Sequence, residues 1–100
     1  MIEEYLFNRY NLAGIILIVD ARHKPTDDDL MMYNCLLEMD VPHLVVGTKV
    51  DKLSNSQLNP NRQQIFDKLN LVDQSTFVYF SAKDGTGKKE VLKFIREAVQ

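Results

Sequence analysis

The feature that most constrains this chain is a continuous aliphatic run, Ile15-Ile16-Leu17-Ile18-Val19, which ends at Asp20. Such a run is typical of a strand buried on both faces, as in a parallel sheet with helices on either side. Two further runs of this kind are Leu44–Gly47 and Phe77–Phe80. The sequence therefore predicts three parallel strands.

Apolar residues at helical spacing occupy the segments between these runs. The predicted helices are Ile2–Tyr10, Asp27–Glu38, Asn61–Leu69 and Gly87–Ala98, and the polar segment Lys52–Asn61 is interpreted as a surface loop. The order is α-β-α-β-α-β-α. The right-handed crossover rule then predicts an α/β fold with three parallel strands and helices on both faces.

Length and composition narrow the class of protein. One hundred residues with a net charge of −2 indicate a single domain, residues 1–100, without a strong field for nucleic acid. The single cysteine, Cys35, excludes an internal disulfide and a cysteine metal cluster. The longest apolar run, Leu12–Val19, is far short of the roughly 20 residues that cross a bilayer. We therefore expect a cytoplasmic protein with no membrane segment and no metal site.

Two polar motifs follow the second and third predicted strands. They are Thr48-Lys49-Val50-Asp51 and, about thirty residues later, Ser81-Ala82-Lys83. Ligands of open α/β sheets bind beyond the carboxyl ends of the strands, where both motifs should meet. Together they resemble the two base-reading motifs of the GTPase superfamily. Each motif taken alone also fits a solvated loop, but their joint position at strand ends favours base recognition.

Guanine presents two donors, N1–H and the exocyclic amine, that one carboxylate accepts in a bidentate pair. Asp51 is placed for this contact, and adenine would leave that carboxylate unpaired. The stems of Lys49 and Lys83 would flank the base, the Ala82 N–H would face guanine O6, and the Ser81 hydroxyl would brace the loop. The predicted guanine-binding residues are Thr48, Lys49, Val50, Asp51, Phe80, Ser81, Ala82 and Lys83.

A possible phosphate-binding motif, Gly85-Thr86-Gly87-Lys88, does not meet the requirements of a P-loop. Ala82 stands where that loop needs glycine, and Lys89 stands where it needs Ser or Thr. We interpret the segment as the turn into the last helix, with Thr86 as its N-cap. Thr26 is the expected N-cap of the helix that the acidic residues from Asp27 open.

The segment from Asp20 to Thr26 allows other interpretations of the function. Asp20, Thr48 and Lys83 at three strand ends also mimic a receiver-like phosphoacceptor domain, although five strands and an acidic pair are not visible. His23 has no second His or Cys at ligand spacing, so a metal role is not favoured. A module that binds partners without nucleotide is the remaining alternative.

The chain resembles the EngB (YihA/YsxC) family of bacterial GTPases over nearly its whole length. The residues that carry this are Met1–Leu6, Leu17–Thr26, Asp29, Met32–Asn34 and Thr48–Lys52. Thr48 supports the assignment, because this family has Thr where most GTPases have Asn. The resemblance implies a partial P-loop GTPase fold, GTP bound with magnesium and hydrolysed, assembly of the large ribosomal subunit, and a septation defect when the protein is lost.

Family members carry a P-loop, a switch threonine and a D-x-x-G segment upstream of the match, and the present sequence contains none of them. We therefore interpret it as the carboxyl-terminal half of such a GTPase, with base recognition only. The expectations are no GTP hydrolysis, weak or absent GTP/GDP binding, and magnesium in the intact parent only. We also expect self-association through an open edge at the strand Ile15 to Val19, where the P-loop strand would pair.

Overall fold

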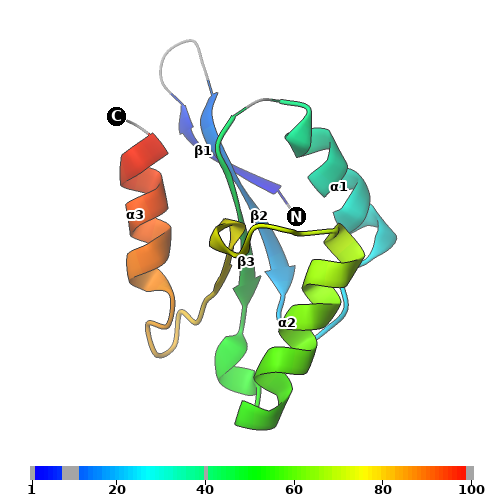
Figure 1. Cartoon of the computed structure of the whole chain (residues 1–100). Coiled ribbons are helices and arrows are strands. Elements are labelled where there is room, and N and C mark those ends of the chain that lie inside the picture. The colour runs from blue at the N-terminus through cyan, green and yellow to red at the C-terminus, as the bar shows by residue number, and fades with distance from the viewer. Residues whose placement is uncertain (1, 8–11, 40, 99–100) are drawn as a thin grey trace.

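The computed structural model describes residues 2–7, 12–39 and 41–98. Its centre is a four-stranded sheet in the order β1 (Ile2–Phe7), β2 (Leu12–Asp20), β3 (His43–Thr48) and β4 (Phe77–Tyr79). Helices α1 (Asp27–Leu37) and α2 (Asn55–Leu69) lie on one side of this sheet and α3 (Lys88–Ala98) lies on the other (Figure 1). The predicted arrangement of strands between two helical layers is therefore confirmed. None of the helices in these ranges is long and apolar enough to span a bilayer.

Three strands are parallel: β2 (Leu12–Asp20), β3 (His43–Thr48) and β4 (Phe77–Tyr79). Their register places Asp20 beside Thr48 and Gly47 beside Tyr79. The carboxyl ends of all three strands therefore meet at one edge, as the sequence predicted.

The opening segment differs from the prediction. The predicted helix Ile2–Tyr10 is wrong over its described part, because Ile2–Phe7 forms strand β1, antiparallel to β2; residues 8–10 lie outside the described residues. The register pairs Ile2 with Leu17 and Phe7 with Leu12. The edge expected to be open at Ile15 to Val19 is covered by β1 from Ile15 to Leu17, so that expectation is wrong over this part of the strand.

Capping residues explain where two helices begin. Helix α1 (Asp27–Leu37) starts with a capping box in which Thr26 and Asp29 satisfy each other's backbone N–H groups, so the predicted Thr26 cap is confirmed. Helix α2 (Asn55–Leu69) starts six residues before the predicted Asn61, after a second box formed by Ser54 and Gln57. The loop predicted for Lys52–Asn61 is thus mostly helix, even with Pro60 inside it.

The two faces of the sheet hold separate cores. On the α1 and α2 face, alternate β2 residues such as Leu17 pack with Leu36 and Ile65. On the other face, Ile16, Leu44 and Val46 pack against the partly buried apolar side of α3 (Lys88–Ala98), including Phe94. This alternation follows from the two-residue period of side chains in a strand.

Aromatic contacts fix β4 to α2. The Phe77 ring lies edge-on to Phe66 at 5.5 Å and to Tyr79 at 5.2 Å between ring centroids. The Arg62 guanidinium stacks over Phe66 at 4.5 Å, and the Tyr79 hydroxyl donates to the Leu58 carbonyl at 2.6 Å. These contacts set the position from which the chain continues toward Ser81.

Candidate functional site

The two predicted motifs meet at the carboxyl edge of the sheet. Backbone hydrogen bonds join them directly: the Val50 N–H donates to the Phe80 carbonyl at 3.2 Å, and the Phe80 N–H donates to the Gly47 carbonyl at 2.8 Å. Residues about thirty positions apart in sequence thus form one loop pair. The sequence-based placement of both motifs is confirmed.

Ser81 connects the two motifs through its side chain. It is fully buried, and its hydroxyl donates to Asp51 Oδ1 at 2.8 Å. Ser81 Oγ also accepts the backbone N–H groups of Lys83 at 3.1 Å and Asp84 at 3.3 Å. The predicted brace is therefore present. It holds the Asp51 carboxylate while leaving Oδ2 without a hydrogen bond among the described residues.

The turn that carries Asp51 has an unusual backbone. Lys49 adopts the left-handed conformation, with φ of 62°, immediately before the short 3₁₀ helix η1 (Val50–Lys52). Non-glycine residues occupy this region rarely, and such positions gather at functional sites. The conformation reverses the chain after β3, so that Val50 is buried and Lys49 is exposed. Nothing in the sequence pattern signals it.

Thr48 lines the pocket and also links the ends of two strands. Its hydroxyl donates to the Val19 carbonyl at 3.2 Å, and its carbonyl accepts the Ala21 N–H at 2.9 Å. A threonine hydroxyl thereby ties β3 to the end of β2.

The segment after β4 is a tight turn, as predicted for Gly85 to Lys88. The Ser81 N–H donates to the Thr86 carbonyl at 2.9 Å, and Gly87 has φ of 77°. A Cβ on Gly87 would lie 2.0 Å from the Tyr79 carbonyl oxygen, so only glycine fits. The predicted Thr86 cap is wrong: Gly87 precedes the helix, and the Thr86 hydroxyl donates to the Asp84 carboxylate at 2.6 Å.

These loops surround an open pocket of about 470 Å³. Seven residues line it: Thr48, Lys49, Asp51, Lys52, Phe80, Ala82 and Lys83. Six of them were predicted; Lys52 was not, while Val50 and Ser81 lie buried behind the surface. The Ala82 backbone N–H has no hydrogen-bond partner among the described residues, so the pocket offers a free donor as well as a carboxylate and three lysines.

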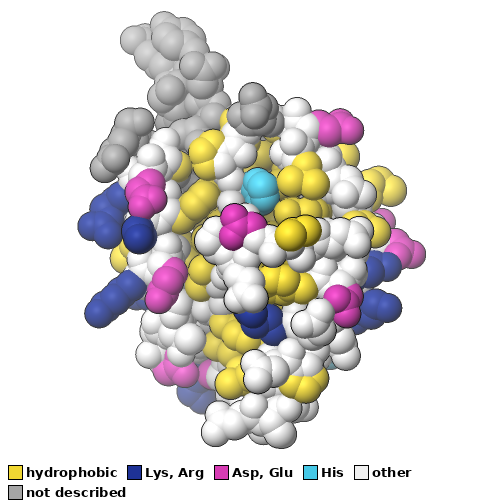
Figure 2. Space-filling model, in the orientation of Figure 1, with side chains coloured by type: hydrophobic (Ala, Val, Ile, Leu, Met, Phe, Trp, Pro, Cys, Tyr) yellow, Lys and Arg dark blue, Asp and Glu magenta, His cyan; other side chains and the backbone are white. Residues whose placement is uncertain are grey.

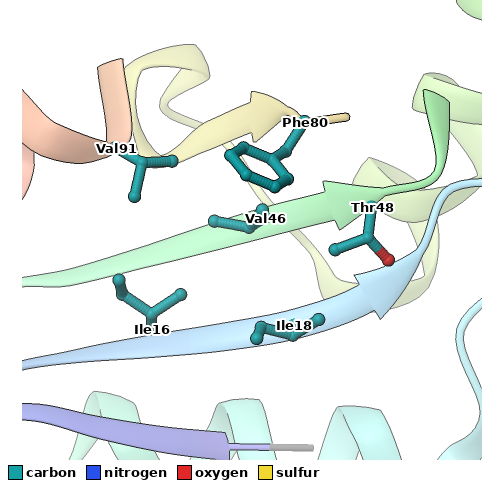
Figure 3. Close-up of a pocket in the computed structure, with 6 residues that line it drawn as sticks. All are labelled: Ile16, Ile18, Val46, Thr48, Phe80 and Val91. Carbon is teal, nitrogen blue, oxygen red and sulfur yellow. The ribbon is translucent and has the colours of Figure 1, made fainter. Parts of the chain in front are cut away.

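A smaller apolar cavity of about 130 Å³ adjoins this pocket. Figure 3 shows Ile16, Ile18 and Val46 on the two strands below Phe80, Val91 to one side on α3, and Thr48 toward the carboxyl end of β3. Thr48 and Phe80 line both spaces. The pocket therefore has one polar side formed by the loops and one apolar side formed by the sheet.

Asp20 and Arg22 form an ion pair at the same edge. Arg22 Nη2 lies 2.8 Å from Asp20 Oδ2, Nε lies 3.1 Å from Oδ1, and the Arg22 N–H also donates to Oδ1 at 2.9 Å. These hydrogen bonds lower the pKa of the Asp20 carboxyl to about 2. Asp20 is thus fully engaged by Arg22, which gives the receiver-like alternative no support.

Metal ions in proteins are held by sets of converging donor side chains. Among the described residues, no group of three His, Cys, Asp or Glu side chains is placed to hold one. His43 contacts the Tyr33 hydroxyl at 3.3 Å.

Comparison with known proteins agrees with this geometry. A family model described as the elongation factor Tu GTP binding domain matches residues 8–100. A probable GTP-binding protein EngB of Halothermothrix orenii is 51% identical over 100 residues, and one of Listeria monocytogenes is 43% identical. These alignments cover 99% and 100% of the chain but 50% and 52% of the relatives, so the chain spans about half their length.

A solved structure shows the same fold. The crystal structure of a probable GTP-binding protein engB superposes with a TM-score of 0.71 at 25% identity, covering 87% of this chain and 57% of that one. With the family model matched over nearly all residues, the chain belongs to the family of elongation factor Tu GTP-binding domains and is related within it to the EngB GTP-binding proteins.

Proposed function

We propose that this chain recognises the guanine base of GTP or GDP with the pocket between η1 and the turn after β4. The observation that carries this is the contact of the buried Ser81 hydroxyl with Asp51, which presents a fixed carboxylate to an open pocket. A carboxylate held in this way loses little freedom when a ligand binds.

The chemistry of the lining matches one edge of guanine. Asp51 accepts the guanine N1–H and exocyclic amine, and the free Ala82 N–H donates to O6. Adenine carries no matching donor pair and would leave the carboxylate unpaired. The aliphatic stems of Lys49 and Lys83 lie on exposed loops at either side, where they cover the two faces of the base. Thr48, Val50, Phe80 and Ser81 support this arrangement.

Base recognition alone gives weak binding. The 100 residues contain no G-x-x-x-x-G-K-[ST] motif, which supplies the phosphate cradle and the magnesium contact in P-loop GTPases. We therefore propose a dissociation constant on the order of millimolar, about −4 kcal/mol. The same reasoning predicts no GTP hydrolysis. Phosphate release above the buffer background, from pure protein with GTP and magnesium, would contradict this.

The EngB resemblance extends the proposal beyond the pocket. It supports assigning the chain to the carboxyl-terminal half of such a GTPase, whose intact form binds GTP with magnesium, assists assembly of the large ribosomal subunit in the cytoplasm and is needed for normal septation. Co-sedimentation of the chain with purified large ribosomal subunits tests this extension. If the subunits do not retain the chain, the ribosomal role is rejected, and the proposal of base recognition still stands.

One substitution tests the base-reading role. Asp51→Asn replaces an acceptor by an amide that donates to the carbonyl that xanthine carries in place of the guanine amine. Saturation-transfer NMR with GDP, XDP and ADP should show preference for GDP in the original chain and for XDP in the variant. Asp28→Asn, an exposed residue of α1, is the matched control and should behave like the original chain. An unchanged preference in Asp51→Asn would refute the proposal.

A further inference from the structure

Helix α1 carries apolar side chains on its solvent side. Met31 is 63% exposed, Met32 40% and Met39, just beyond the helix, 52%, and Cys35 is exposed as well. We call these four residues the methionine stripe. Figure 2 shows hydrophobic side chains at the surface on the side of the molecule where α1 lies.

The stripe is one surface and not scattered exposure. Met31 and Cys35 are four residues apart and so lie on one side of α1, Met32 adjoins Met31, and Met39 follows in the turn after the helix. Tyr33 and Leu36, which are both buried, form the side of α1 that packs into the core. No described residue of this chain covers the stripe, and contiguous exposed apolar surface of this kind marks an interaction site.

The surroundings of the stripe are acidic. From Pro25 to Thr48 the sequence has five carboxylates and no Lys or Arg. Asp28 and Glu38, near the two ends of the stripe, are exposed. The cations near the amino end of α1, Lys68 from α2 and the exposed Lys24, both interact with Asp27, so among the described residues the free carboxylates beside the stripe are Asp28 and Glu38. A negative rim repels phosphate groups, so it disfavours both nucleic acid and anionic membranes and favours a basic partner.

We infer that the methionine stripe docks a basic amphipathic helix of a partner protein, an apolar ridge flanked by Lys and Arg. Thioether side chains are flexible and polarizable and adapt to the ridge of a facing helix. Met31 to Met39 spans about 12 Å, which corresponds to a partner contact of two to three helical turns. Asp28 and Glu38 then pair with basic residues at the two ends of the contact.

A second copy of the chain is the competing occupant. Leu92 on α3 is 47% exposed, and Lys88, Lys89 and Arg96 surround it on the helix surface. We favour a separate partner because this single exposed leucine offers far less apolar surface than three methionines require. Self-association of the chain through the stripe would instead identify a second copy as the occupant.

The test uses a fluorescent synthetic helix as the probe. Its sequence repeats Leu at helical spacing with Lys on both flanks, and a second peptide carries Glu in place of Lys. Fluorescence anisotropy with the whole chain should show micromolar binding of the Lys peptide and none of the Glu peptide. The double variant Met31→Ser with Met39→Ser should weaken binding about tenfold or more.

Two controls separate docking from unfolding. Val72→Ser removes an apolar side chain that is 92% exposed but outside the stripe, and it should leave binding unchanged. Circular dichroism should give the same melting temperature for the stripe variant and the original chain, because the stripe is outside the core. Glu38→Lys should weaken binding severalfold, and Glu90→Lys on α3 should not.

Three results would overturn the inference. The first is equal binding of the Lys peptide by the stripe variant. The second is binding of polyuridine or phosphatidylglycerol vesicles that the stripe variant loses. The third is sedimentation equilibrium showing self-association of the chain without peptide that both the stripe variant and Leu92→Ser abolish, which would assign the stripe to a second copy.

Discussion

The two faces of the sheet are filled unequally. On the side of α1 and α2, ten buried residues form one closed cluster around β2 and β3. On the side of α3 only three described residues are fully buried, and a cavity of about 130 Å³ opens between β2, β3 and α3. The first face supplies most of the buried apolar surface, and hence most of the stability.

The difference separates stability from binding. The polar loops at the carboxyl edge adjoin the α3 face of the sheet, because Phe80 and Thr48 line both the cavity on that face and the pocket. The brace from Ser81 to Asp51 spans the two loops independently of the larger cluster. Changes in the closed face should therefore alter folding, and changes at the carboxyl edge should alter ligand selectivity.

Neighbouring isoleucines of β2 give the largest expected contrast. Ile15 is 1% exposed in the closed cluster, and Ile16 is 3% exposed beside the cavity on the other face. We expect Ile15→Ala to lower the free energy of unfolding by about 4 kcal/mol and Ile16→Ala by about 2 kcal/mol. Urea denaturation followed by circular dichroism measures both. Equal losses would mean that the two faces contribute alike.

Two glycines of the turn after β4 give a contrast of intermediate size. Gly85 and Gly87 both have positive φ, but a Cβ on Gly85 meets nothing within 4 Å, whereas one on Gly87 meets the Tyr79 carbonyl. Gly85→Ala should cost about 1 kcal/mol from backbone strain alone. Gly87→Ala should cost about 2–3 kcal/mol, since β4 or the turn must also move. Thermal melting of both variants checks the order, and the reverse order would contradict it.

Acid should weaken the two regions in separate pH windows. Burial lowers the pKa of His43, which contacts Tyr33 on the closed face, below its ordinary value of 6.5. The folded chain then binds fewer protons than the unfolded chain, so stability falls as the pH drops below 6.5. Arg22 lowers the pKa of Asp20 from 3.8 to about 2, so the stability from this pair is lost between those values.

Each acid step should be about 1 kcal/mol or less, because both groups are partly solvated. Denaturation midpoints at pH 7.5, 5.5 and 3 measure them. His43→Gln should flatten the first step. Asp20→Asn should reduce the second step without abolishing it, because the pKa values of Asp27, Asp73 and Asp84 are lowered as well. Higher stability at pH 5.5 than at pH 7.5 would contradict the assignment to His43.

The parallel strands and the site loops could be predicted because the signals are local. Uninterrupted aliphatic runs located β2 and β3, and the polar tetrad after Gly47 and the triad after Phe80 located the pocket. Even the bracing role of Ser81 followed from its place in the motif.

Other features depend on contacts that the sequence pattern does not reveal. Ile2, Tyr5 and Leu6 have helical spacing, but pairing with β2 makes the segment a strand. Pro60 and the surrounding polar residues concealed the first two turns of α2, whose start is marked only by Ser54 and Gln57. The left-handed backbone of Lys49 directly precedes Val50, whose N–H bonds to the distant Phe80 carbonyl, and it has no sequence signal.

The most direct measurement of base recognition is a ¹⁵N NMR titration of the chain with GDP and, separately, with ADP at millimolar concentrations. GDP should shift the amide signals of Asp51 and Ala82, which line the pocket, while the signals of Ile15 and Leu17 in the closed face stay fixed. ADP should leave all four signals unchanged. Equal shifts of Asp51 and Ala82 with ADP, or no shift with GDP up to its solubility limit, would contradict guanine recognition at this edge.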